Sequence, residues 1–222
     1  MTRALVSWSS GKDSAWALHR LRQDARYEVV GLFCTVNRAF GRVAMHGVRI
    51  TLLRAQAARL GLPLEVIELP FPCSNAAYER IMGAFVEKAR GQGIGAFAFG
   101  DLFLEDVRAY RERQLEGSGI APVFPLWGEP TGALAREMIA AGLRAVLTCV
   151  DPRQAPAALA GRAFDAALLA ELPEGVDPCG ERGEFHSFVW DGPMFSAPVS
   201  VEPGEVVERD GFLYADLVPA GA

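Results

Sequence analysis

Short apolar runs alternate along the chain with segments whose apolar residues recur every three to four positions. The apolar runs occupy residues 4–8, 29–34, 64–69, 96–100 and 122–126. The periodic segments predict helices over residues 14–22, 53–60, 78–89 and 105–116. Continuous apolar strands that alternate with helices are typical of a parallel sheet covered on both faces. The pattern therefore predicts an α/β fold with a five-stranded parallel sheet, whose proline-containing fifth strand lies at an edge.

The pattern changes near residue 127. A helix is expected around residues 134–141, followed by a strand at 145–150 and an alanine-rich helical stretch. Beyond Pro173 the apolar runs are short, and the Asp-Gly pair at 210–211 between two such runs predicts a β-hairpin. We therefore expect a nucleotide-type domain over residues 1–127 and a smaller α+β domain over residues 128–222.

Composition narrows the class of protein. The 222 residues are 50% hydrophobic and 22% charged, which excludes a disordered chain. The formal net charge of −5 does not favour nucleic acid as a partner. The four cysteines form no Cys-x-x-Cys pair, and the three histidines lie too far apart for a familiar zinc spacing. No signal-peptide pattern or membrane-length apolar run is present, so we expect a cytoplasmic protein with reduced thiols and no membrane partner.

The segment SWSSGKDSAW, residues 7–16, has the composition of an anion site. An apolar strand ends there, small residues turn the chain, and a helix begins whose first N–H groups and dipole favour an anion. Lys12 adds a positive charge suited to phosphate. The segment fits neither the Walker P-loop nor the dinucleotide turn. The alternative is a tight strand-to-helix turn with Asp13 or Ser14 as the helix cap.

The order Ser-x-Gly-Lys-Asp-Ser after a first strand resembles the PP-loop of the ATP pyrophosphatases. Enzymes of that superfamily cleave ATP between the α and β phosphates and release pyrophosphate. Ser10 stands where the superfamily usually has glycine, and this replacement requires a negative φ at that position. By this resemblance the nucleotide is held by Ser9, Ser10, Gly11, Lys12, Asp13 and Ser14.

A second segment, DPCGERGEFHSFVWDGPMF at residues 177–195, is more specific. Its glycines and proline could simply shape a loop with solvated acids. However, two glutamates, a cysteine and a histidine in one glycine-rich loop are more typical of a reactive site. Together with the PP-loop and the blocks at 45–49, 56–64, 74–79, 99–112 and 119–127, this segment resembles the diphthine–ammonia ligase family. GEFHSFV is similar to the shorter prokaryotic relatives, which leaves the acceptor substrate open.

The resemblance implies an adenine-nucleotide α-hydrolase sheet with a smaller domain across a cleft. It implies that a substrate carboxylate is adenylated by ATP and then attacked by ammonia. Cys34, Thr35, Gly100 and Asp101 would line the adenosine or its metal. Mg²⁺ would be supported by Asp101, Glu105 and Asp106, although the last two also fit the acidic first turn of a helix.

The second domain would face the acceptor with Cys179, Glu181, Glu184 and His186. One of the last three residues would take the proton from ammonia, and Lys12 and Asp13 would act on the phosphates. The acceptor would be a carboxylate on a small molecule or on a modified protein side chain, and a homodimer is compatible with the sequence. Two other functions remain open: a nucleotide-binding regulatory protein without turnover, and a PP-loop enzyme that modifies RNA.

Overall fold

The computed structural model describes residues 1–43 and 45–221, and within these ranges the first sheet has six strands, five of them parallel. The parallel strands run in the order β4–β2–β1–β5–β6. Their bounds are β1 Thr2–Ser7, β2 Tyr27–Asn37, β4 Leu64–Leu69, β5 Ala96–Ala98 and β6 Ala121–Val123. The predicted α/β fold is therefore confirmed, and β6 lies at the edge as its prolines indicated. A short antiparallel strand, β3 (Arg42–Val43), was not predicted, because two residues leave no periodicity.

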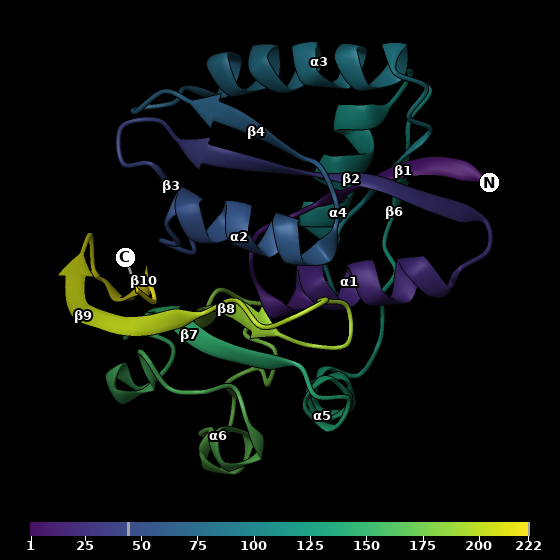
Figure 1. The fold of residues 1–222 in the computed structure, drawn as a ribbon. Coiled ribbons are helices and arrows are strands. Elements are labelled where there is room, and N and C mark those ends of the chain that lie inside the picture. The colour runs from purple at the N-terminus through teal and green to yellow at the C-terminus, as the bar shows by residue number, and fades with distance from the viewer. Residues whose placement is uncertain (44, 222) are drawn as a thin grey trace.

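Helices cover both faces of this sheet (Figure 1). On one face lie α3 (Asn75–Gly91) and α4 (Glu105–Leu115), and a cluster that includes Phe33, Phe85 and Phe97 is buried beneath them. On the other face lie α1 (Lys12–Gln23) and α2 (Ile50–Leu60). The core on that side is continuous with the core of the second domain, so α1 and α2 are buried between two sheets.

The second sheet is antiparallel, in the order β8–β7–β10–β9. Its strands are β7 Arg144–Val150, β8 Phe185–Asp191, β9 Val201–Arg209 and β10 Phe212–Pro219. Asp210 and Gly211 form the two-residue turn between β9 and β10, with φ values of 51° and 79°, so the predicted hairpin is confirmed. The helical elements of this region are α5 Thr131–Ala140, the 3₁₀ helix η1 Ala157–Leu159 and α6 Ala166–Glu171.

Two kinds of contact join the halves of the molecule. The backbone N–H of Val189 on β8 donates to the carbonyl of Ser10 at 3.0 Å. Asp216 on β10 accepts hydrogen bonds from Arg42 and Arg49, which flank the loop between β3 and α2. The first sheet and its helices are therefore held against strands β8 and β10 of the second sheet. Among the described residues, no helix has the length and apolarity needed to cross a membrane.

Candidate nucleotide site

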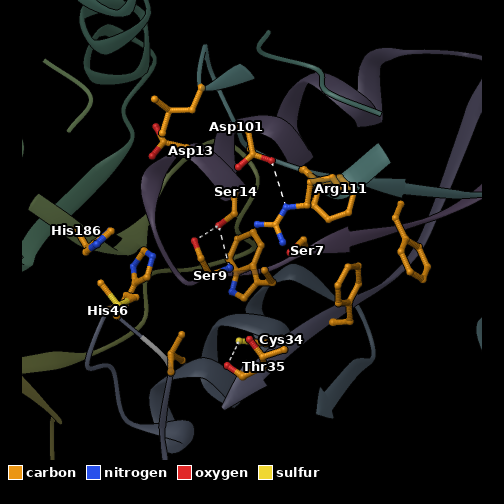
Figure 2. A pocket seen from close by; sticks show the side chains of 18 of the residues that line it. Ser7, Ser9, Asp13, Ser14, Cys34, Thr35, His46, Asp101, Arg111 and His186 are labelled. Carbon is orange, nitrogen blue, oxygen red and sulfur yellow. Dashed lines mark hydrogen bonds and ion pairs between the residues drawn. The ribbon is translucent and has the colours of Figure 1, made fainter. Parts of the chain in front are cut away.

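A cavity of about 420 Å³ lies at the carboxyl ends of β1, β2 and β5, where α1 begins (Figure 2). This volume falls within the range of roughly 300–1,000 Å³ found for small-molecule sites. The loop before β8 and the first residues of β8 complete the wall. The sequence-predicted residues that line the cavity are Ser9, Lys12, Asp13, Ser14, Cys34, Thr35, Gly100, Asp101, Glu181 and His186. Residues from both halves of the chain therefore share one cavity.

The turn after β1 is closed by its own hydroxyl groups. The Ser9 hydroxyl donates to Ser14 Oγ at 3.1 Å, and Ser14 Oγ donates in turn to the Gly11 carbonyl at 2.9 Å. The Gly11 N–H donates to Ser9 Oγ at 3.3 Å. Helix α1 has Gly11 as its N-cap and no side-chain cap, so the alternative in which Asp13 or Ser14 caps the helix is wrong. The start of α1 therefore keeps a polar face toward the cavity.

Ser10 adopts a left-handed conformation, with φ of 73°. The sequence analysis required a negative φ here, and the structure contradicts that condition. Such a backbone costs a non-glycine residue about 1–2 kcal/mol. Ser10 is fully buried, and its hydroxyl has no hydrogen-bond partner within the described residues and does not line the cavity. Ser10 therefore contributes to the site through its backbone.

Two glycines allow other chain segments to approach the start of α1. A Cβ on Gly100 would lie 2.8 Å from the carbonyl carbon of Asp13 and 2.9 Å from the nitrogen of Ser14. A Cβ on Gly11 would lie 2.7 Å from Cε1 of His46. The atoms that face Gly100 belong to the backbone, so the packing around the turn requires glycine there, whereas a side chain at Gly11 would require the His46 ring to move.

Lys12 is buried and held rather than free in the cavity. Its ammonium donates to Oδ2 of Asp13 at 2.9 Å and to the carbonyl of Cys179, and it lies 5.4 Å from the Phe185 ring centre. Burial opposes the charge, but anionic neighbours led by Asp13 outweigh it and raise the pKa of Lys12. Burial raises the pKa of Asp13, against the opposing effect of Lys12. The cavity wall thus holds an ion pair at the first turn of α1.

Glu181 reaches the cavity from the second domain. Its Oε1 accepts a hydrogen bond from the Leu102 N–H at 2.7 Å. Burial raises the pKa of Glu181 to about 7, and the negative charges of Asp13 and Asp101 add to this increase against the opposing hydrogen bond and Lys12. A carboxyl group with this pKa exchanges a proton readily near neutral pH.

His46 and His186 lie beside the turn with their rings tilted by 38° and their ring centres 4.6 Å apart (Figure 2). Nδ1 of His46 lies 3.1 Å from the Ser187 carbonyl, which only accepts, so the proton is assigned to Nδ1. Burial lowers the pKa of His46 to about 4 and that of His186 to about 3. Both imidazoles are therefore neutral near pH 7. The ring of His46 lies directly against Gly11.

Six of the predicted site residues lie outside the cavity wall: Ser10 and Gly11 of the turn, Cys179, Glu184, Glu105 and Asp106. The carboxylate of Glu184 accepts from the N–H groups of Asp177 and Arg182, both at 2.9 Å, so it shapes the loop. Cys179 is buried, and burial raises the pKa of its thiol, which keeps the thiol protonated. Glu105 and Asp106 are exposed in the first turn of α4, as the helix-terminus reading indicated. Within residues 1–43 and 45–221, no three acidic, histidine or cysteine side chains form a ready metal cluster.

Arg111 is a cavity residue that the sequence analysis missed. Its Nε lies 3.5 Å from Oδ2 of Asp101, and its guanidinium lies 4.9 Å from the centre of the Phe99 ring (Figure 2). Burial raises the pKa of Asp101, and Arg111 opposes this effect. The available signal was its position one turn before Leu115 on the inner face of α4. The cavity therefore holds a second cation, on the side opposite the second domain.

Comparisons with known proteins agree with this arrangement. The family model described as the diphthamide synthase N-terminal domain matches residues 2–122, and the corresponding C-terminal domain model matches residues 130–215. The diphthine–ammonia ligase of Homo sapiens is 31% identical over 141 residues, covering 59% of this chain and 49% of the relative. That of Rattus norvegicus is 29% identical over 137 residues, with the same coverage. That of Danio rerio is 34% identical over 106 residues, covering 44% of this chain and 40% of the relative. The chain thus spans half or less of the length of these curated relatives.

Proposed function

Because the chain belongs to the diphthamide synthase family, we propose that it is an ATP-dependent ligase that joins ammonia to a substrate carboxylate. One observation supports this proposal above the others. The cavity at the start of α1 is also lined by Glu181 and His186 of the second domain, so one cavity offers an anion-binding wall and a proton acceptor. The names of the relatives, diphthine–ammonia ligase, suggest ammonia and a diphthine-like acceptor.

ATP would place its phosphates against the turn at residues 9–14. The positive end of the α1 dipole, the Lys12 ammonium and the Ser9 and Ser14 hydroxyls would favour the phosphates there, and the absence of a Cβ at Gly100 lets that segment pack against the helix start. The adenosine would extend toward Cys34 and Thr35, in the carboxyl-terminal half of β2. Ligands in parallel α/β sheets bind beyond the carboxyl ends of the strands, and this placement follows that rule.

In the first half-reaction a carboxylate oxygen of the acceptor attacks the α-phosphorus, and pyrophosphate leaves. Both reactants are anions, so the site must offset their repulsion and stabilise the charge that develops on the leaving group. Lys12 and Arg111 are the cations in the cavity wall that suit this task. The ion pair between Lys12 and Asp13 keeps the ammonium at the first turn of α1.

Mg²⁺ fits this site through Asp13 and Asp101. Both carboxylates line the cavity, and Oδ1 of Asp13 is buried without a partner among the described residues. Mg²⁺ is commonly held by one or two carboxylates together with phosphate oxygens, and when bound it would neutralise phosphate charge. Glu105 and Asp106 are not included, because their side chains are exposed outside the cavity.

In the second half-reaction ammonia attacks the activated acyl carbon, AMP leaves, and the nitrogen loses a proton. Glu181 is the base we assign, because its pKa of about 7 allows it to accept a proton and release it again. His186 lines the same cavity, but burial lowers its pKa to about 3, which makes it a weaker base. Its neutral ring would instead shape the acceptor side of the cavity.

The test is to incubate the protein with ATP, Mg²⁺, ammonium and a protein that carries diphthine, and to identify the products. We expect AMP and pyrophosphate in amounts that depend on the acceptor, and an amide on the acceptor by mass spectrometry. Formation of ADP and phosphate would overturn the ligase assignment. Nucleotide binding without any turnover would favour a regulatory protein.

An enzyme that thiolates RNA is the less supported alternative. Such chemistry uses a reactive thiolate, and the thiol that lines the cavity is that of Cys34. Burial raises the pKa of Cys34 to about 12, so this thiol stays protonated near neutral pH.

A further inference from the structure

Gln56 of α2 is fully buried, and its side-chain amide makes three hydrogen bonds to groups outside its own helix. Its Oε1 accepts from the indole N–H of Trp8 at 2.8 Å. Its Nε2 donates to the carbonyl of Ser10 at 3.0 Å and to the carbonyl of Val189 at 2.6 Å. Gln56 therefore joins three elements at one point: α2, strand β8 and the turn at residues 9–14, which we call the nucleotide turn.

The chemistry of these partners requires glutamine in one orientation. The indole of Trp8 can only donate, and the two carbonyls can only accept. Only a side chain with one acceptor and two donors on a planar group satisfies all three. Glutamate lacks the donors, and an apolar residue of the same size leaves buried polar groups without partners.

These bonds act on the one residue of the turn whose backbone is strained. Ser10 has φ of 73°, and its carbonyl is fixed twice, by Gln56 Nε2 and by the Val189 N–H at 3.0 Å. The Ser10 hydroxyl contributes nothing to this conformation, because it has no partner within the described residues. A left-handed conformation is disfavoured for a non-glycine residue by a factor of about 5 to 30, so it persists only where the surroundings impose it.

We propose that Gln56 is a positioning residue for the nucleotide, which holds Ser10 in the left-handed conformation and so presets the turn at residues 9–11. The identity of the nucleotide as ATP rests on the proposed function. The role of Gln56 rests on its own contacts, and it acts through Ser10 rather than by touching the phosphates.

The same contacts link the turn to the second domain. Val189 follows His186 and Ser187 on β8, and the latter two line the cavity. The hydroxyl of Ser187 accepts from the Lys12 N–H at 3.1 Å. The shape of the nucleotide turn is therefore set jointly by α2 and by the strand that forms the acceptor side of the cavity.

The test is a double-mutant cycle between Gln56→Met and Ser10→Gly. We expect Gln56→Met to raise the Kd for the non-hydrolysable analogue α,β-methylene-ATP by about tenfold, because the turn then relaxes toward ordinary φ values. Adding Ser10→Gly should return the Kd to within about threefold of the wild-type value, because glycine adopts the left-handed conformation without penalty. Adding Ser10→Ala instead should give no rescue, because alanine keeps the Cβ.

Two further variants complete the design. Gln23→Met, at an exposed position of α1, is the matched control and should leave the Kd unchanged. Trp8→Phe removes the donor that orients the Gln56 amide, together with part of a buried ring that lines the cavity, and it serves as a second variant if Gln56→Met does not fold. Its smaller loss of affinity should also be rescued by glycine and not by alanine at position 10. Urea unfolding of the same variants without nucleotide should show the same glycine-specific coupling.

Equal effects of glycine and alanine at position 10, in both binding and unfolding, would overturn the positioning role. Failure of the proposed function has a different signature. If the wild-type protein released ADP while the glycine-specific rescue held, the ligase assignment would fall and the role of Gln56 would stand.

Discussion

At the scale of single residues, burial determines the chemistry available to the charged groups of the cavity. Lys12 is 1% exposed, yet it stays charged because Asp13 lies 2.9 Å away. Among the residues that the structure describes, Glu181 forms no ion pair, and burial therefore raises its pKa to about 7. The same physical effect thus yields a fixed cation on one wall and an exchangeable proton on the other.

Replacing Lys12 by alanine should abolish detectable pyrophosphate release. Loss of one donor to developing charge raises an activation barrier by about 3–4 kcal/mol, or roughly a hundred- to a thousandfold in rate. The variant should also be less stable, because it leaves the Asp13 carboxylate, which is only 26% exposed, without its cation. We expect a loss of roughly 3 kcal/mol of unfolding free energy.

The double variant Lys12→Ala/Asp13→Asn separates the two effects. Removing both charges should restore most of the unfolding free energy, measured in urea, while pyrophosphate release stays undetectable. Near-normal turnover in either variant would contradict the role assigned to Lys12.

Replacing Glu181 by glutamine should remove the acid limb of the pH–rate profile. In the wild-type protein the ammonia-dependent step should rise with pH through about 7, as Glu181 becomes ionised. With the concentration of free ammonia held constant at each pH, the variant should show a slow step without that rise, while acceptor-dependent exchange of pyrophosphate into ATP continues. A wild-type profile retained in the variant would exclude Glu181 as the base.

The same variant should be more stable than the wild-type protein above pH 7. The folded pKa of Glu181 lies above the unfolded value, so between about pH 4.5 and 7 the folded state binds more protons. Stability from this group is therefore present at low pH and is lost as the pH rises through 7. Urea unfolding at pH 5 and pH 8 should show the advantage of glutamine only at the higher pH.

At the scale of helices and strands, local pattern determines what can be predicted from the sequence. Each predicted strand of the parallel sheet is present, and the run at residues 64–69 matches β4 residue for residue. Buried apolar runs and helical periodicity are local signals, so they survive in a single sequence. The hairpin at Asp210-Gly211 is another local signal, because turn geometry is set by the two residues themselves.

Residues whose roles depend on loop conformation or on distant partners could not be predicted. Glu184 resembles a catalytic acid in sequence, but its oxygens bind backbone N–H groups within its own loop. Gln56 gave no signal, because its partners lie 46 and 133 residues away in the chain. The conformation of Ser10 was wrongly expected for the same reason, since Gln56 and Val189 stabilise it from other elements.

Replacing Gly100 by alanine should displace the start of α1 and abolish binding of ATP. The added Cβ would meet backbone atoms of Asp13 and Ser14 at 2.8–3.0 Å, and backbone cannot move aside as a flexible side chain can. We expect the Kd for α,β-methylene-ATP to rise at least a hundredfold by calorimetry.

Gly83→Ala is the matched control, because that glycine lies in α3 with no atom within 4 Å of an added Cβ. It should leave binding unchanged and stabilise the protein by up to about 1 kcal/mol. Equal binding by both variants would contradict the close approach of Gly100 to the helix.

At the scale of the whole molecule, the cavity exists because two sheets enclose α1 and α2 (Figure 1). Neither half forms the cavity wall alone, since Glu181 and His186 come from the second domain and the nucleotide turn comes from the first. The loop between β3 and α2, which carries His46, lies at this junction. Arg42 donates both to the Gly47 carbonyl of that loop, at 2.6 Å, and to Asp216 of β10, at 2.8 Å. A substitution that weakens this junction should therefore also alter the shape of the cavity.

Replacing Asp216 by asparagine should weaken both the junction and nucleotide binding. Burial opposes ionisation of Asp216, but hydrogen bonds from Arg42 and Arg49 outweigh it and lower its pKa to about 2. Because the folded pKa lies below the unfolded value, this stabilisation is present above pH 4 and is lost as the pH falls through 2. Since the pair is partly exposed, we expect the variant to lose roughly 1 kcal/mol at pH 7.

Urea unfolding should show that the difference between Asp216→Asn and the wild-type protein shrinks between pH 4 and pH 2, where the native carboxyl also becomes neutral. The Kd for α,β-methylene-ATP should rise a few-fold at pH 7, because the loop that places His46 against Gly11 loses its attachment to β10. Glu65→Gln is the matched control, since Glu65 pairs with Lys88 at 2.7 Å on the exposed surface of the first domain. That variant should change neither the free energy of unfolding nor the Kd for α,β-methylene-ATP measurably. A variant at Asp216 that lost stability but bound the analogue normally would show that the junction and the nucleotide turn are independent, and the cavity would then be shaped by α1 and β8 alone.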